Sequence, residues 1–276
     1  MPAETVPAET VPAETFPAET VPARSGPAPA MLAKITLMEF RLFVRDIVGP
    51  ALIVVLPIAL LLGFGLMPGG TRASKDLAGQ SAAEYIASID VGLVLVVLGF
   101  TILPSVISDY REKGVLRRLG TTPVRPSRLL LAQLLIYSVS ALLVVALVVV
   151  FGNAVFGTPI PERSGYFVLA VLLGMGALFG IGLVVAAVAP SGKAGSAIGM
   201  ALFFPSMLLG GVYIPREKEA AAMRAIGDYT PLGATLKTVR DSWQGLDPHP
   251  AQLAALAAYA VVAIAAAVRL FRWESK

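Results

Sequence analysis

The chain has 276 residues, of which 56% are hydrophobic and only 14% are charged, and its mean hydropathy is +0.77. Such a composition excludes a soluble globular domain and is typical of a multi-span membrane protein. The absence of cysteine excludes disulfides and cysteine-ligated zinc or iron–sulfur sites. The net charge is only +4, and the basic residues flank apolar runs without interleaved aromatic residues, so no nucleic acid partner is indicated.

The chain begins with a five-residue repeat, PAETV or PAETF, that ends at Arg24. A period of five matches no helix or strand face, and the proline in each unit removes a backbone donor. We therefore expect residues 1–30 to form a disordered tail. The next segment, residues 31–46, is largely apolar and carries Lys34, Arg41 and Arg45 within one narrow arc of a helix. This pattern predicts an interfacial helix; the alternative is a cytoplasmic extension of the first span.

Six apolar runs follow, each close to the roughly 20 residues that a helix needs to cross a bilayer. They predict an all-α membrane protein whose six-span domain covers residues 47–272, with a cytoplasmic tail at residues 273–276. Pro205 leaves an alternative open, in which the fifth run is a re-entrant pair. The expected spans are residues 48–67, 86–107, 129–151, 166–189, 195–213 and 253–271.

The basic residues predict the orientation of these spans. Fourteen lie on the side that the two termini share with the loop between the second and third spans, and eight lie on the other side. Because basic residues accumulate in cytoplasmic loops, both termini and this loop should be cytoplasmic, in the cell membrane of a bacterium.

The loop at residues 109–128, DYREKGVLRRLGTTPVRPSR, has an internal pattern. Val115, Leu116 and Leu119 share one face of a short helix, and Gly120 and Pro123 then stop it before the next span. The pattern predicts a cationic helix whose small apolar face docks into a groove on a cytoplasmic partner. The basic residues around this face are Arg111, Lys113, Arg117 and Arg118.

The spans lack the mid-membrane charges that ion-coupled carriers use. Asp90 is the only carboxylate near a span, and we expect it at the outer end of the second one. There is also no phosphate-binding loop, because Gly192-Lys193 is followed by Ala194 where serine or threonine is required. We therefore expect no catalytic residue, metal or cofactor in this chain. The alternatives are a carrier that uses Asp90, an intramembrane enzyme and a membrane anchor.

Glycines recur at a spacing of four in two of the runs, at Gly176 and Gly180 and at Gly195 and Gly199. This spacing allows helices to approach closely in lipid. It predicts helix packing, within one chain or at a dimer face.

An amphipathic helix is predicted within residues 214–250. Thr230 can cap it, and Pro231 occupies its first position. We expect an extracellular helix that dips into the membrane boundary; the alternative is a helix packed on the spans. The residues of its apolar face are Leu232, Leu236, Val239 and Trp243.

The loop and the LLLAQLL that follows it resemble a stretch of type-2 ABC exporter permeases, especially the daunorubicin- and doxorubicin-resistance-type multidrug permeases. GGVYIP at residues 210–215 and PLGATLKTVRDSW at residues 231–243 resemble two further patches of that family. The likeness covers roughly residues 31–272 and leaves out the repeat tail. In the loop, the matching residues are Glu112, Gly114, Val115, Leu116, Leu119 and Pro123.

The resemblance implies a permease that exports amphipathic small molecules, as in multidrug efflux and antibiotic resistance. Two copies, or one copy and a related permease, would pair with two separate ATPase subunits, which bind ATP and Mg. Residues 31–46 would be the interfacial connecting helix, and residues 214–250 would hold short extracellular helices. Export of a lipid-linked glycan or polymer is the alternative. The residues that would couple the chain to the ATPase are Arg111, Glu112, Gly114, Val115, Leu116, Arg118, Leu119 and Pro123.

Overall fold

A computed structural model describes residues 36–41, 45, 48–77, 79–115, 126–214 and 218–270. Every regular element in these ranges is a helix, which confirms the predicted all-α class. The repeat tail, residues 116–125 of the loop and residues 273–276 lie outside the described residues. Of the predicted interfacial helix, the structure describes residues 36–41 and 45, which are helical.

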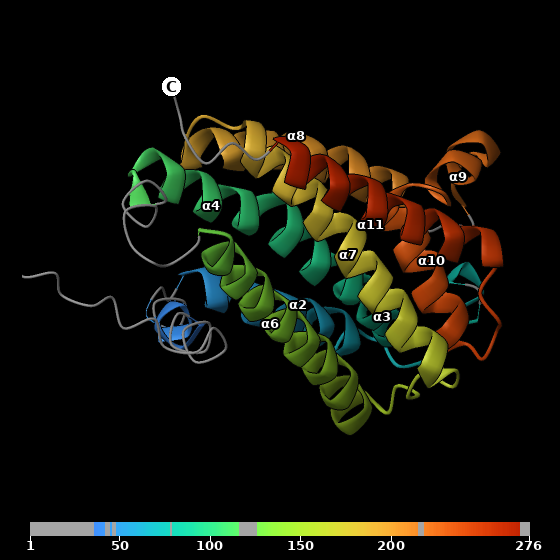
Figure 1. The fold of residues 1–276 in the computed structure, drawn as a ribbon. Helices are drawn as coiled ribbons and strands as arrows, with labels where there is room; N and C mark the ends of the chain where they lie inside the picture. Colours follow the sequence, from blue (N-terminus) through green and yellow to red (C-terminus); the bar gives the residue numbers. More distant parts are fainter. Residues whose placement is uncertain are drawn as a thin grey trace, which may run out of the picture.

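Long helices run between the two ends of the molecule (Figure 1). The long elements are α2 (Val48–Gly65), α3 (Ala82–Val96), η2 (Val97–Ile102), α4 (Leu103–Glu112), α6 (Pro126–Phe156), α7 (Ser164–Val188), α8 (Gly192–Leu209) and α11 (Pro250–Leu270). The short ones are η1 (Lys75–Leu77), α9 (Ala221–Gly227) and α10 (Pro231–Trp243). The elements α3, η2 and α4 form one continuous helix, in which η2 is a π-helical turn.

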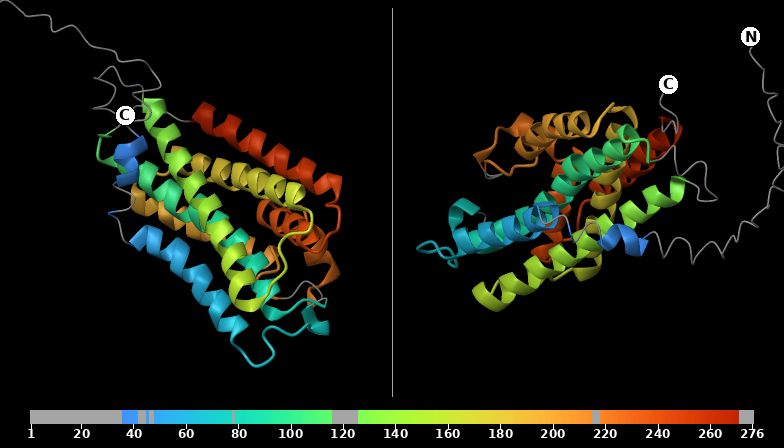
Figure 2. Two further views of the ribbon diagram at one scale, coloured as in Figure 1. Left: turned by 90° about the horizontal axis from the view of Figure 1, so that it is seen from below. Right: turned by 90° about the vertical axis from the view of Figure 1, so that its left-hand side faces the viewer.

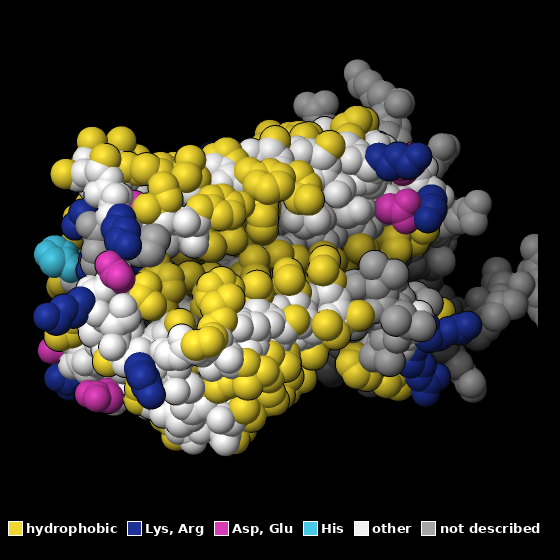
Figure 3. All heavy atoms as spheres, turned by 180° about the vertical axis from the view of Figure 1, so that it is seen from behind, with side chains coloured by type: hydrophobic (Ala, Val, Ile, Leu, Met, Phe, Trp, Pro, Cys, Tyr) yellow, Lys and Arg dark blue, Asp and Glu magenta, His cyan; other side chains and the backbone are white. Residues whose placement is uncertain are grey.

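The described helices include five that are long and apolar enough to cross a membrane, and α2 contains a shorter apolar helix, Ala51–Gly65. Figure 3 shows charged side chains at the two ends and apolar side chains between them, as expected for a membrane protein. α8 stays helical through Pro205, so the structure does not contain the re-entrant alternative. The five longer stretches are Lys75–Glu112, Leu129–Phe156, Ser164–Val188, Gly192–Leu209 and Pro250–Leu270.

The α3–η2–α4 helix is central: α2 and α6 pack on one side of it, and α7 and α8 on the other (Figure 2). It begins at Ala82, earlier than predicted, because Ser81 and Glu84 form a capping box. The Ser81 hydroxyl accepts from the Glu84 amide, and the Glu84 carboxylate accepts from the Ser81 amide.

The π-helical turn ends two residues before Pro104, which has no amide hydrogen to donate to the Gly99 or Phe100 carbonyl. Glycines of two neighbouring helices lie against these carbonyls. A Cβ atom on Gly182 of α7 would overlap the Gly99 oxygen, and one on Gly199 of α8 would overlap the Phe100 oxygen. The central helix therefore packs backbone to backbone with α7 and α8.

The two ends of the bundle have different structures. One end, which we call the loop end, holds residues 36–41, the end of α4, the α7–α8 turn and the end of α11 (Figure 1). The other, which we call the α10 end, holds the α2–α3 and α6–α7 connections together with α9 and α10. Both ends of the described chain lie at the loop end, as an even number of spans requires. Which end faces the cytoplasm stays a prediction.

The apolar face of α10 is buried in the protein, whereas we expected it to be exposed to the membrane boundary. Leu232, Leu236, Val239 and Trp243 are at most 2% exposed. The helix packs on α3, α7 and α11, which is the alternative arrangement. Glycines make room for it: a Cβ atom on Gly92 would lie 2.6 Å from Leu236 Cδ2.

Candidate functional site

The first half of the predicted coupling segment lies where α4 ends. Arg111 and Glu112 are the last residues of α4, and Gly114 forms the following turn with a φ of +67°. This left-handed conformation favours glycine and separates α4 from Val115. The other predicted coupling residues, Leu116, Arg118, Leu119 and Pro123, lie outside the described residues.

Arg111 and Glu112 join the end of α4 to the α7–α8 turn. Arg111 Nη1 donates to the Ala187 carbonyl of α7 at 2.7 Å. Glu112 Oε2 accepts from the Gly192 amide at 3.1 Å, at the start of α8. A carboxylate at a helix N-terminus is favoured by the helix dipole. The end of α4 is therefore linked to both α7 and α8 by polar contacts.

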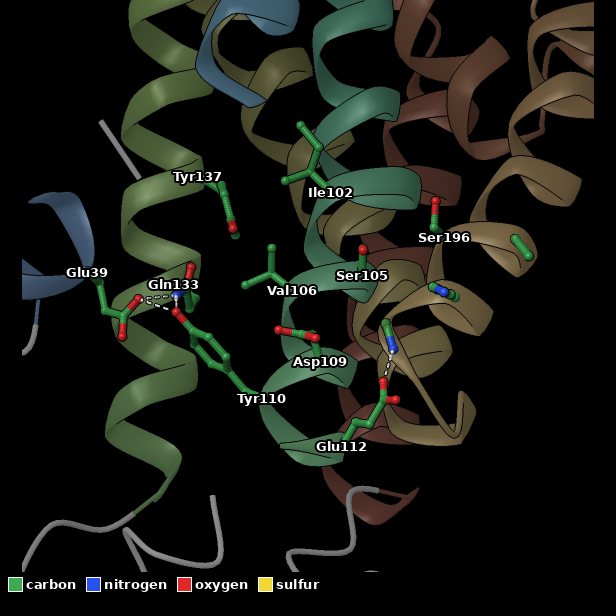
Figure 4. Close-up of a pocket in the computed structure, with 13 residues that line it drawn as sticks. Glu39, Ile102, Ser105, Val106, Asp109, Tyr110, Glu112, Gln133, Tyr137 and Ser196 are labelled. Atoms are coloured by element: carbon green, nitrogen blue, oxygen red, sulfur yellow. Dashed lines mark hydrogen bonds between the residues drawn. The ribbon is translucent and has the colours of Figure 1, made fainter. Parts of the chain in front are cut away.

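A second polar cluster joins residues 36–41 to α4 and α6 (Figure 4). Tyr110 of α4 donates its hydroxyl to Glu39 Oε2 at 2.8 Å, and Gln133 of α6 donates Nε2 to the same oxygen. Glu39 is only 9% exposed. Burial raises the pKa of the Glu39 carboxyl, and the hydrogen bonds from Tyr110 and Gln133 oppose this shift without reversing it.

Glu39, Tyr110 and Gln133 were not among the site residues predicted from the sequence. Two signals were available: Glu39 is a carboxylate within a basic, apolar segment, and Gln133 interrupts the apolar run LLLAQLL. Neither signal indicates that the two side chains meet.

A cavity of about 820 Å³ opens between these two clusters at the loop end (Figure 4). Its lining comes from residues 36–41, the π-helical turn, α4, α6 and α8. Glu39, Asp109 and Glu112 contribute carboxylates to it, and Lys193 is the one cationic side chain among the described residues that line it. Tyr110 and Tyr137 add aromatic rings, so the cavity is acidic and partly aromatic.

Asp90 lies about two helical turns inside α3, further from the start of its helix than the predicted span placed it. It is fully buried, and neither carboxylate oxygen has a hydrogen-bond partner. The difference arises because the capping box starts the helix before the predicted span. Among the described residues, no three histidine, aspartate or glutamate side chains form a group that could hold a metal ion.

The four glycines of the predicted packing motifs all face helices of the same chain. Cβ atoms on Gly176 and Gly180 would lie 3.2 Å from Ala260 Cβ and 2.9 Å from Ala263 Cβ of α11. One on Gly195 would lie 2.7 Å from the Pro104 oxygen, and Gly199 faces Phe100 of the π-helical turn. The predicted packing surfaces are thus occupied within one chain.

A family model described as ABC-2 type transporter matches residues 32–242. The chain belongs to the ABC-2 type transporter family. The match extends from the predicted interfacial segment to α10, and thus includes the loop, both polar clusters and the cavity. No curated protein matches the chain significantly. This ABC-2 family member is a membrane transport component, the permease of an ABC transporter.

Proposed function

We propose that this ABC-2 permease exports amphipathic small molecules of drug or antibiotic type, driven by separate ATPase subunits that dock at the loop end. The family implies an ABC ATPase as partner. We further propose two permease copies, or one copy and a related permease, with two ATPase subunits that bind ATP and Mg. The loop end would then face the cytoplasm of a bacterial cell.

The attachment of the end of α4 to two other spans supports this proposal most directly. An ATPase that displaces residues 109–123 would pull on the Ala187 carbonyl through Arg111 and on the start of α8 through Glu112. The π-helical turn lies in the same continuous helix as α4, and glycines of α7 and α8 pack against it. The displacement would therefore also change how α7 and α8 pack on the central helix. A π-helical turn is a frequent site of such adjustment.

Replacing both Leu116 and Leu119 with aspartate should abolish the substrate-stimulated part of ATP hydrolysis. Two carboxylates would have to be buried in the docking groove, so we expect stimulation to fall about tenfold or more. The measurement uses the permease and its ATPase reconstituted in vesicles. Leu246→Asp, at an exposed position of the α10 end, is the control and should retain stimulation.

Normal stimulation in the double variant would refute the coupling role of the segment. The same vesicles test the ion-coupled carrier, which the burial of Asp90 favours as second candidate. Cargo movement without the ATPase, driven by a proton gradient and lost in Asp90→Asn, would support the carrier and contradict our proposal.

The combined variant Arg111→Met and Glu112→Gln should uncouple hydrolysis from transport. Both side-chain contacts to the α7–α8 turn would be lost or weakened, each worth about 1–3 kcal/mol, while the apolar docking residues Val115, Leu116 and Leu119 would be unchanged. We expect basal hydrolysis to persist and cargo moved per ATP to fall about tenfold. The matched control is Lys113→Met, because Lys113 is exposed and, among the described residues, forms its ion pair with Asp109 of α4. Equal losses in both variants would mean that the contacts to the turn carry no coupling.

A further inference from the structure

We propose that the cavity at the loop end binds an organic cation with an aromatic or apolar body, through the carboxylates of Glu39 and Asp109. The inference rests on the proposed function and specifies the class of cargo. Of the eight residues proposed to couple the chain to the ATPase, Glu112 also lines the cavity, and Asp109 and Tyr110 lie directly before them in α4.

The size and walls of the cavity fit a small organic molecule. Its volume of about 820 Å³ falls within the roughly 300–1,000 Å³ of small-molecule sites. Ile102 and Val106 on the central helix, with Ala197 of α8, form apolar parts of the lining. In Figure 4 the central helix forms the floor, α6 one wall and α8 the other.

The charge of the lining selects a cation. Glu112 already accepts from the Gly192 amide, and Asp109 pairs with the exposed Lys113. Glu39 is the most deeply buried of the three carboxylates, and its partners, Tyr110 and Gln133, are both neutral. Within the part of the chain that the structure describes, no cation pairs with Glu39. A cationic ligand would remove the penalty of burying its charge. Burial raises the pKa of the Glu39 carboxyl, which is the same cost of removing its charge from water.

The aromatic residues favour a diffuse charge over a compact one. Tyr110 and Tyr137 line the cavity close to Glu39 (Figure 4), and tyrosine rings attract organic cations through cation–π contacts. Within the described part of the chain, the three carboxylates of the lining are not grouped closely enough to hold a metal ion. An alkylammonium, phosphonium or protonated amine with rings therefore fits better than a metal ion.

The test is equilibrium binding of tetraphenylphosphonium to the purified full-length permease in nanodiscs, without the ATPase. Tetraphenylborate is the matched probe, because it has the same shape and the opposite charge. We expect the phosphonium to bind at least about tenfold more tightly than the borate. In Glu39→Gln, which keeps the size of the side chain, phosphonium affinity should fall about tenfold.

Two further variants keep the test independent of the folding of Glu39→Gln. Asp109→Asn should weaken phosphonium binding, and Lys193→Gln should strengthen it, because Lys193 places a cation in the described lining. Asp247→Asn, an exposed carboxylate at the α10 end, is the control and should leave binding unchanged. Equal affinities for the two probes, or unchanged binding in Glu39→Gln, Asp109→Asn and Lys193→Gln, would overturn the inference.

The binding assay separates this inference from the proposed function. If the permease alone fails to distinguish the probes while the reconstituted complex exports another cargo with ATP, only the cation site is wrong. If the phosphonium binds as expected but ATP never drives its export, the site stands and the proposed export function fails for this cargo class.

Discussion

Replacing Gly199 with alanine should destabilise the bundle strongly, although alanine is normally the better helix former. A Cβ atom at this position would overlap the Phe100 carbonyl oxygen of the π-helical turn, so α8 and the central helix would have to separate. Overpacking of this kind costs about 1–3 kcal/mol. Because the neighbour of Gly199 is rigid backbone, we expect the cost of this substitution at the upper end of that range. The measurement is the thermal unfolding midpoint of the purified permease in nanodiscs.

Gly63→Ala provides the matched control for this prediction. Gly63 lies inside α2, and a Cβ atom added there would meet no neighbouring helix or side chain within 4 Å. There the same substitution should be neutral or stabilise by up to about 1 kcal/mol, because alanine has the higher helix propensity. Equal effects at both positions would show that α8 does not pack against the π-helical turn.

Replacing Trp243 with alanine should also destabilise the permease, by about 3–5 kcal/mol. Trp243 is 2% exposed, and its ring packs edge-to-face on that of Phe167, with 5.4 Å between the ring centroids. Its indole Nε1 donates a hydrogen bond to the Pro159 carbonyl at 2.7 Å. The substitution removes all three contributions and leaves a cavity between α10 and α7. Chemical or thermal unfolding in nanodiscs measures the loss.

Two companion variants identify the source of the effect. Trp243→Phe keeps the ring contact but loses the hydrogen bond, so its loss should be about 1–2 kcal/mol. Tyr229→Ala removes an aromatic side chain that is 48% exposed at the same end and should have a small effect. A small effect of Trp243→Ala, like that of Tyr229→Ala, would instead favour a helix whose tryptophan faces lipid.

The helical class and the positions of the apolar runs were predictable because they depend on local chemistry. A bilayer leaves backbone groups without water, so an apolar run of sufficient length forms a helix whatever it packs against. Pro104 shows the limit of such reasoning. Its missing amide predicts a disturbance of the helix, but the π-helical turn and the glycines that face its carbonyls involve three separate helices.

The burial of α10 and the position of Asp90 were not predictable in this way. An apolar helix face has the same sequence pattern whether lipid or protein covers it. Here protein covers it, because Gly92 of α3 and Gly174 of α7 leave room for α10 to pack closely. Asp90 was placed at the end of a span because an apolar run was taken as the extent of the helix. The capping box at Ser81 starts that helix at Ala82, before the apolar run.

By itself, the sequence of this ABC-2 permease determined an all-helical membrane protein with a patterned loop between its second and third spans. Local composition and spacing suffice for both, because each depends on neighbours in the chain. The tertiary structure alone determined the acidic cavity. Glu39 lies 71 residues from Tyr110 and 94 residues from Gln133, and no spacing rule relates side chains that only the packing of three helices brings together.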